Sequence, residues 1–326
     1  MEELVQESLK QVQEKARGTV PWKPDEVWSQ DCNIWKGNEW TSVKSTTGGG
    51  KPLSVLALYS WNIDFMLPYA DSRMNKALDH LRGLISQEHE ATAKVVFLQE
   101  CVFSDIKLLT SHSWIRETFV LSDVDVLNWQ SGHYGTVTLI DRRLPISSVF
   151  RVHYAATRME RDGLFVDVKL NDKTVRLCNT HLESLALEPP YRIPQMKLCA
   201  EYMRASHIHG AIAAGDFNAI QGFDKALHSD NGLKDAYLER GGKEDDLEGH
   251  TWGQQAATKL REQFGTTRMD KVFFCGGLDV ASYDKFGADV CVDEAPEQEL
   301  IVKLGFDKPW ITDHLGVKAV FRVLGS

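Results

Sequence analysis

The sequence predicts an α+β fold, in which strands and helices are interspersed along a chain of 326 residues. An apolar run at 53–60 (LSVLALYS), a helix with apolar residues on one face between 74 and 85, and a second run at 95–100 (VVFLQE) form a β-α-β opening. Further runs follow at 134–140, 147–154, 163–170 and 174–182, the last two joined tightly through Asn171-Asp172. We therefore expect antiparallel pairing in the middle of the chain.

The later elements each meet polar residues at one end. A helix over about 193–203 follows the proline pair at 189–190 and leads into AIAAGDFNA (211–219), a short apolar strand that breaks into polar residues. RMDKVFF (268–274) places an acid beside another apolar strand, and ITDHLGVKAVFRVL (311–324) places Asp-His just before the last one.

The first 51 residues differ in character from the rest. Apolar side chains at helical spacing predict a short amphipathic helix over 3–17, and four tryptophans between 21 and 51 indicate an extended arm that packs on a larger body. We therefore expect a helix and Trp-rich arm over 1–51 and one main domain over 52–326.

The overall charge argues against one class of function. With 37 basic against 46 acidic residues the net charge is −9, which disfavours a protein that coats nucleic acid through its overall charge, although a local basic groove stays open. The six cysteines show no CxxC pair and no zinc-site spacing, which favours free thiols in a reducing compartment. No signal-peptide pattern or long apolar run is present. We expect an intracellular monomer, nuclear or cytoplasmic, without membrane contact.

Polar side chains recur at the ends of the predicted strands, where a sheet can point them into one crevice. Taken singly, each has an ordinary structural explanation as a turn residue or a hydrogen-bonded core histidine. A lone Glu with several Asp, Asn and His residues, and no Cys ligand, suits hydrated Mg²⁺ or Mn²⁺ better than a closed zinc site. Phosphate chemistry is the natural use of this set, which comprises Asn62, Glu100, His181, Asp216, Asn218, Asp270, Asp313 and His314.

The order of the motifs WN-D, LQE, THLES, GDFN, RMD and TDH resembles the endonuclease/exonuclease/phosphatase superfamily, which has the DNase I-like fold. The resemblance runs from about 53 to 324 and is greatest to the 5′-tyrosyl-DNA phosphodiesterase branch. It implies a four-layer α/β/β/α sandwich of two mixed β-sheets flanked by helices, with the active site at one edge. The main domain over 52–326 would then be the catalytic domain.

The resemblance also implies roles for the individual residues. Glu100 would be the principal Mg²⁺ ligand, with Asn62 and Asp313 in or near the water shell of the metal, and Mn²⁺ as a substitute. Asp216 would position the attacking water and Asn218 would hold the phosphate. His181 and His314 would stabilise the transition state, and Asp270 would orient His314. Trp252 would form a wall beside the substrate, with packing in the core as an equal alternative.

Three positions depart from the pattern of that branch. Ile220 stands where the branch has Arg, Phe65 where it has Gly, and Thr312 where it has Ser. The loss of an arginine removes a charge-assisted contact, so the chemistry is better supported than the substrate. Several cationic residues flank the motifs and could form a rim that attracts phosphate, with ordinary solvated charges as the alternative. They are Arg158, Arg161, Arg192, Lys197 and Arg268. We expect Arg158 and Arg161 to bind substrate.

The sequence thus favours a Mg²⁺-dependent phosphodiesterase that acts on a phosphoester at a nucleic acid end, such as a 5′-tyrosyl-DNA linkage. A second hypothesis keeps the chemistry but changes the substrate to RNA, an inositol phosphate or another small phosphate ester. A third is an inactive binding module of the same fold. The retention of all the costly polar residues ranks it last.

Overall fold

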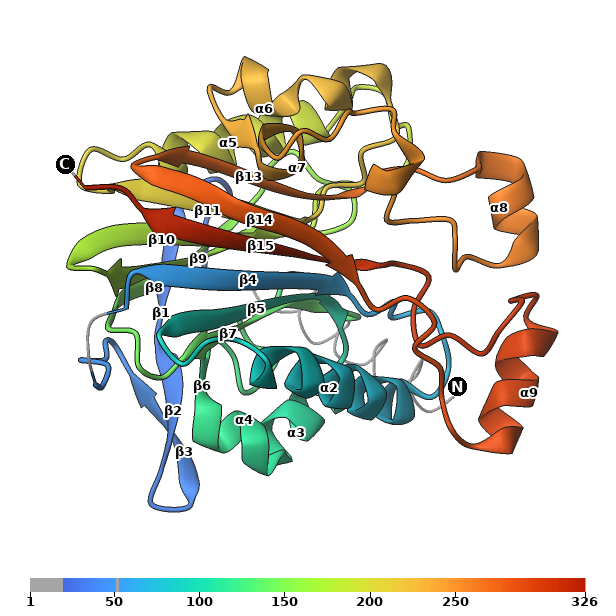
Figure 1. Cartoon of the computed structure of the whole chain (residues 1–326), viewed down its shortest axis with the longest axis horizontal. Coiled ribbons are helices and arrows are strands. Elements are labelled where there is room, and N and C mark those ends of the chain that lie inside the picture. Colours follow the sequence, from blue (N-terminus) through green and yellow to red (C-terminus); the bar gives the residue numbers. More distant parts are fainter. Residues whose placement is uncertain (1–19, 51–52, 326) are drawn as a thin grey trace.

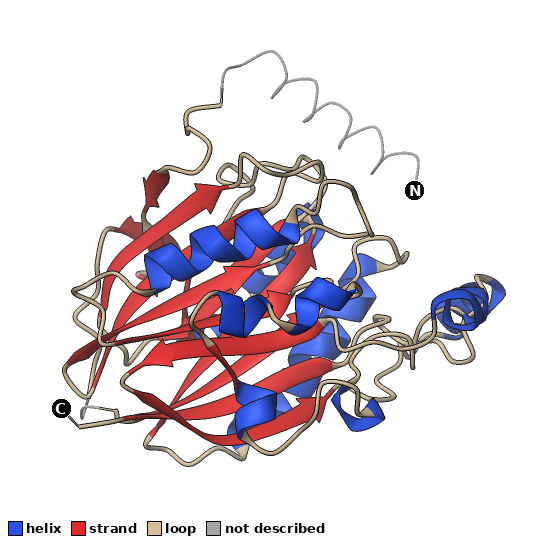
Figure 2. Ribbon diagram, turned by 90° about the horizontal axis from the view of Figure 1, so that it is seen from above, coloured by secondary structure: helices blue, strands red, loops and turns tan. Residues whose placement is uncertain are grey.

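The computed structural model describes residues 20–50 and 53–325, so the helix predicted over 3–17 lies outside the described residues. Within them, the chain folds into two mixed β-sheets that pack face to face, with helices on the outer surfaces (Figures 1 and 2). This arrangement confirms the predicted α+β fold with its four-layer sandwich.

The first sheet has the strand order β1-β8-β9-β10-β11-β13-β12. Its strands are β1 (Val27–Gln30), β8 (Ile146–His153), β9 (Asp162–Leu170), β10 (Lys173–Thr180), β11 (Gly210–Asp216), β12 (Lys234–Asp235) and β13 (Asp270–Gly276). The predicted hairpin joins β9 to β10, and Asn171 and Asp172 both have positive φ angles, 48° and 60°, as a two-residue I′ turn requires.

The second sheet has the order β14-β15-β4-β5-β7-β6-β2-β3. Its strands are β2 (Cys32–Lys36), β3 (Glu39–Val43), β4 (Val55–Asn62), β5 (Thr92–Cys101), β6 (Phe119–Leu121), β7 (Gly135–Asp141), β14 (Leu278–Phe286) and β15 (Gly316–Val323). Strands β4 and β5 pair in parallel, which confirms the β-α-β opening.

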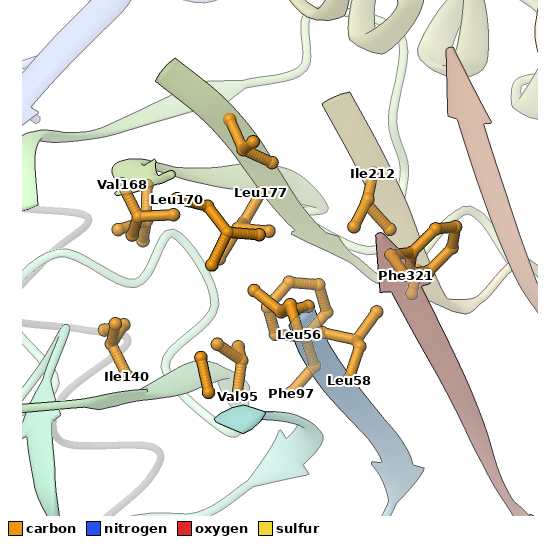
Figure 3. Close-up of a cluster of buried hydrophobic side chains, with 14 of the residues drawn as sticks. Leu56, Leu58, Val95, Phe97, Ile140, Val168, Leu170, Leu177, Ile212 and Phe321 are labelled. Atoms are coloured by element: carbon orange, nitrogen blue, oxygen red, sulfur yellow. The ribbon is translucent and has the colours of Figure 1, made fainter. Parts of the chain in front are cut away.

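The main core lies between the two sheets, where aliphatic side chains and Phe97 and Phe321 interdigitate (Figure 3). Two outer cores lie under the helices, one beneath α2 (Ala70–Ser86) and α3 (Phe103–Ser111) and one beneath α5 (Arg192–Met203). The other described α-helices are α4 (Ser113–Thr118), α6 (Leu227–Asp230), α7 (Ala236–Glu239), α8 (Thr258–Phe264) and α9 (Ala295–Lys303). None of the helices that the structure describes is long and apolar enough to cross a membrane.

The Trp-rich segment contributes strands as well as aromatic anchors. Strand β1 pairs with β8, and the β2–β3 hairpin joins the other sheet through β6. Trp22 is buried, and its ring stacks on His153 with the centroids 4.0 Å apart. The sequence predicts the anchoring but not these strands, because none of the three contains an apolar run.

Strand direction brings the predicted polar residues to one edge of the sandwich. Strands β4 and β5 are parallel in one sheet and β10 and β11 are parallel in the other, and the hydrogen bond from Asn62 at the end of β4 to Asp216 at the end of β11 shows that all four end at the same edge. Strands β13 and β15 run antiparallel to β11 and β4, so both begin at the same edge. We call this edge the site edge.

Candidate active site

Asn62, the last residue of β4, links two carboxylates at the site edge. Its Nδ2 donates to Oε1 of Glu100 at 3.2 Å and to Oδ2 of Asp216 at 3.0 Å. Glu100 follows a register shift in β5 and has a left-handed φ of 58°, and its other oxygen accepts a hydrogen bond from the backbone N–H of Phe65 at 2.9 Å. These contacts fix one Glu100 oxygen toward Asp216 and leave its side chain 15% exposed.

His181 lies just beyond β10, and its two ring nitrogens have different surroundings. Nη1 of Arg161 lies 2.6 Å from Nδ1, and Arg161 also donates to Oγ of Ser184 at 2.9 Å. An arginine side chain only donates, so Nδ1 accepts and the proton of the ring is on Nε2. That nitrogen lies 3.3 Å from Oδ2 of Asp216, is buried, and has no hydrogen-bond partner among the described residues. It is therefore a donor directed at the centre of the site.

His314 is held from the opposite side by Asp270, the first residue of β13. Its Nδ1 lies 2.8 Å from Oδ2 of Asp270, which also accepts a 2.7 Å hydrogen bond from the Thr251 hydroxyl. Nε2 of His314 lies 3.6 Å from Oδ2 of Asp216 and 3.8 Å from Oδ1 of Asp313. Burial alone would lower the pKa of His314, but the carboxylates of Asp270, Asp216 and Asp313 raise it well above its usual value. The structure thus favours a cationic imidazole.

Asp216 is the carboxylate on which both imidazoles and the Asn62 amide converge. Burial would raise its pKa, but His314 and His181 lower it below the ordinary value, so Asp216 is ionised. Its Oδ1 accepts a 2.8 Å hydrogen bond from the backbone N–H of Asn218. Asn218 has a left-handed φ of 48°, and its Nδ2 donates to the Leu182 carbonyl at 3.1 Å.

Asp313 and Trp252 form a further part of the site edge. Nε1 of Trp252 donates to Oδ2 of Asp313 at 2.7 Å, and the Trp252 side chain is largely buried. Burial raises the pKa of Asp313, and burial followed by the charges of Asp313 and Glu100 raises the pKa of Asp64. The carboxylates of Glu100, Asp313 and Asp64 are therefore close enough to repel one another, in addition to the cost of burial.

This crowding fits a divalent cation. Ligand atoms of Glu100, His181 and Asp216 all lie within 4.8 Å of one another, and those of Asp216, Asp270 and His314 form a second such group. The oxygen-rich set around Glu100 has the hard donor atoms that such a cation prefers. A bound cation would also offset the repulsion between carboxylates that, after burial, raises the pKa of Asp64 and Asp313. Asp270 is a poorer ligand, because one of its oxygens is already engaged by His314 and Thr251.

The structure corrects part of the predicted basic rim. Arg192 is buried and paired with Asp224, with Nη2 to Oδ2 at 2.7 Å. Arg268 is likewise buried and paired with Asp235, with Nη1 to Oδ2 at 2.8 Å. Neither side chain reaches solvent, and the charge of each neutralises a buried carboxylate that is more than 30 residues away in sequence.

The other predicted cations differ in their surroundings. Arg161 is buried against His181, whereas Arg158 is exposed and donates from Nε to the Tyr191 hydroxyl at 3.0 Å. Lys197 is also exposed, on α5. The structure thus brings all eight predicted polar residues, Trp252 and Arg161 to the site edge and leaves Arg158 as a surface cation.

Two residues at the site were not predicted. Arg73 of α2 is buried and donates to five backbone carbonyls, those of Ile63, Asp64, Leu67, Pro68 and Ile311, which fixes the loop after Asn62 against the segment before Asp313. The signal available was a charged residue beside the apolar face of the helix predicted over 74–85. Thr251, which bonds Asp270, directly precedes Trp252 and gave no separate signal.

Two packed mixed sheets with a carboxylate–imidazole cluster at one edge define the class of two-sheet α/β sandwiches with a candidate divalent-metal site at the strand ends. A model of the Endonuclease/Exonuclease/phosphatase family matches residues 59–314, and the chain belongs to that family.

Proteins of known identity match across most of this chain. Tyrosyl-DNA phosphodiesterase 2 of Rattus norvegicus is 26% identical over 246 residues, covering 72% of this chain and 62% of that protein. The 5′-tyrosyl-DNA phosphodiesterase of Caenorhabditis elegans is 22% identical over 233 residues, covering 70% and 60%. This chain thus spans about three fifths of the length of these relatives.

Solved structures share the fold. The truncated Caenorhabditis elegans TDP2 superimposes with a TM-score of 0.62 at 20% identity, covering 82% of this chain and 98% of that one. TDP2 of D. rerio in complex with a single-strand DNA product gives a TM-score of 0.61 at 18% identity, covering 83% and 100%. These likenesses confirm the DNase I-like fold.

Proposed function

We propose that the protein is a Mg²⁺-dependent phosphodiesterase that hydrolyses a phosphoester at a DNA 5′ end, such as a 5′-tyrosyl-DNA linkage. One observation carries the proposal. Asp216, a buried and ionised carboxylate, is contacted from three sides by the Asn62 amide and the Nε2 atoms of His181 and His314. The family membership and the named relatives support the reaction class and the substrate.

The roles of the side chains follow from what each can donate or accept. Bound at Glu100, with Asn62 and Asp313 near its water shell, Mg²⁺ would neutralise a phosphoryl oxygen. Asp216, which accepts hydrogen bonds from the Asn62 amide and the Asn218 N–H, would orient the attacking water. Asn218 would contact a phosphoryl oxygen with the amide hydrogen that Leu182 does not use.

The two histidines would donate to the phosphorus-bound oxygens from Nε2. Arg161 at Nδ1 sets the tautomer of His181, and Asp270 at Nδ1 orients His314 and favours its cationic form. Both donors would strengthen as negative charge develops on the phosphoryl oxygens, which is the form of catalysis that lowers the barrier. Trp252 would wall one side of the site through its bond to Asp313.

The partner we propose is a DNA end, with a nuclear or cytoplasmic location and a monomeric state. Substrate identity is tested by hydrolysis of a 5′-tyrosyl oligonucleotide beside a 5′-phosphate oligonucleotide, an RNA and an inositol polyphosphate, each with Mg²⁺ and with EDTA. Mg²⁺-dependent release of tyrosine supports the proposal. Metal-dependent activity on another of these substrates alone would keep the chemistry and refute the substrate, and inactivity on all would favour a binding module.

A further inference from the structure

Two loops at the site edge expose aliphatic side chains. The first loop, 182–191, follows β10 and His181, and the second, 217–224, follows β11 and Asp216. Leu185 is 57% exposed in the first loop, and Ile220 is 38% exposed in the second. Neither loop contains a lysine or an arginine. We call these two side chains the Leu185–Ile220 surface.

A buried ion pair fixes the two loops to each other. Arg192 donates from Nη1 to the Leu185 carbonyl at 2.7 Å and from Nε to Oδ1 of Asp224 at 2.8 Å. Oδ2 of Asp224 in turn accepts the backbone N–H groups of Ile220 at 2.9 Å and Gln221 at 2.7 Å. Removing either charge would leave the other buried without its partner, so the pair favours a single arrangement of the loops.

The backbone of Leu185 is itself unusual. Its φ of 68° is in the left-handed region, which a leucine rarely adopts, and the Arg192 contact to its carbonyl accompanies that conformation. More than half of the side chain is exposed, so burial in the core does not explain why it is there. A strained, exposed apolar residue beside a catalytic centre indicates a contact with a ligand.

The loops are also joined to the centre at their base. The Leu182 N–H donates to the Asp216 carbonyl at 3.0 Å, and the Leu182 carbonyl accepts from Asn218. The Leu185–Ile220 surface is therefore anchored to the residues that we propose hold the phosphate and the water.

We propose that the Leu185–Ile220 surface binds the face of an unpaired nucleobase in the DNA strand whose 5′ end occupies the site. This inference rests on the proposed function and names a part of the substrate that the site recognises. A nucleobase has two apolar faces that pack on aliphatic side chains, whereas a phosphate backbone needs cations. Arg192 is committed to Asp224, and Lys225, the next cation along the chain, is paired with Asp245. The exposed Arg158 beside the first loop donates to the Tyr191 hydroxyl.

A peptide attached to the leaving group fits this surface less well, because its backbone needs hydrogen-bond partners. The polar side chains of the two loops are largely engaged. Oε1 of Gln221 accepts from Arg192 at 2.9 Å, and Oγ of Ser184 accepts from Arg161 at 2.9 Å. Glu183 is held by Thr157 at 2.7 Å and by the Arg158 N–H at 2.8 Å.

The test is equilibrium binding, which does not depend on turnover. Fluorescence anisotropy would compare a 5′-phosphorylated single-stranded oligonucleotide that has thymine at its first two nucleotides with one that has abasic sites there. We expect wild-type protein to bind the thymine form about 5- to 10-fold more tightly, at the lower end of the range for base stacking because the side chains are aliphatic. The Leu185→Ser/Ile220→Ser double variant should lose this ratio and bind both forms alike.

The matched control is Leu324→Ser. Leu324 is 47% exposed and follows the end of β15, at the edge opposite the site, so its variant should keep the wild-type ratio. Repeating the titration at two salt concentrations distinguishes base contacts from phosphate contacts. Added salt weakens the phosphate contacts, whereas the ratio of the affinities for the thymine and abasic oligonucleotides should stay the same if it comes from a base contact.

Three results would overturn the inference: equal wild-type affinity for the two oligonucleotides, an equal loss of affinity for both in the double variant, or no binding of either. The second result would assign the surface to a part that both oligonucleotides share, the sugar–phosphate backbone. Failure to hydrolyse tyrosyl-DNA would instead refute the proposed function, and the anisotropy ratio would still decide the base contact.

Discussion

Asp270→Asn isolates the charge behind His314 while keeping its geometry. In the native protein Oδ2 of Asp270 accepts hydrogen bonds from both His314 and Thr251, and Oδ1 has no partner among the described residues. An asparagine can keep its oxygen toward His314 and place its amide where Oδ1 is. The substitution therefore removes the negative charge without removing the acceptor.

The expected magnitude follows from the strength of these contacts. Hydrogen bonds to charged groups contribute about 1.5–3 kcal/mol and are roughly twice as strong as neutral ones, so the two contacts together lose about 2 kcal/mol. If His314 stabilises the transition state as a cation, 2 kcal/mol corresponds to roughly a 30-fold loss in kcat. The carboxylate of Asp270 also raises the pKa of His314, so the alkaline limb of the pH–rate profile should move to lower pH.

Stability should change with the same sign. A histidine whose pKa is raised on folding adds stability that is full below its unfolded pKa and is lost as pH rises through the folded pKa. The difference in Tm between wild type and Asp270→Asn should therefore be largest in mild acid and shrink in alkali. Thr251→Val is the control, because it removes the two hydrogen bonds between the Thr251 hydroxyl and Asp270 and keeps the charge. A pH–rate profile that coincides with wild type, with kcat within twofold, would refute the assignment of His314 as a cationic donor.

Three further predictions test other parts of the site. Glu100→Gln should abolish Mg²⁺-dependent hydrolysis and the Mg²⁺-induced rise in Tm, measured by a thermal-shift titration, and a retained rise would place the metal elsewhere. Arg161→Met should lower kcat about 10- to 100-fold. It should also leave the His181 ring free to exchange between tautomers, which ¹⁵N chemical shifts would show. An unchanged Nε2–H signal would contradict the positioning role of Arg161. Arg192→Met should lower the free energy of unfolding by about 3–5 kcal/mol in urea denaturation, because Asp224 stays buried without its partner. A loss below about 1 kcal/mol would show that Asp224 is solvated in the variant.

The site could be predicted from sequence because its residues are at strand ends. An apolar run marks a strand, and the polar residue that ends it marks the edge. The direction of β4 and β5 places Asn62 and Glu100 at one end of the second sheet, and that of β10 and β11 places His181 and Asp216 at one end of the first. The packing of the two sheets then brings these ends together, as the Asn62–Asp216 hydrogen bond shows.

The positions of the arginines could not be predicted in this way. Arg192 and Asp224 are 32 residues apart, and Arg268 and Asp235 are 33 apart, so no local pattern shows that each pair is buried together. An arginine beside a motif in the sequence is equally consistent with an exposed basic rim and with a buried ion pair. The short strands of the Trp-rich segment were missed for a related reason, because their burial depends on partners in β6 and β8.

The buried arginines explain how an acidic chain would handle a phosphoester. Arg73 and Arg192 bond backbone carbonyls of the loops at the site edge, and Arg161 bonds a histidine nitrogen, so their positive charge orients the site and does not face solvent. Neutralisation of the phosphate then depends on the metal at Glu100 and on the Nε2 donors of the histidines. Ile220, and not an arginine, stands beside Asn218, so at this position the binding of a DNA strand that we propose would need contacts other than charge. The same loops provide an apolar surface there, which is why we expect base recognition to depend weakly on salt.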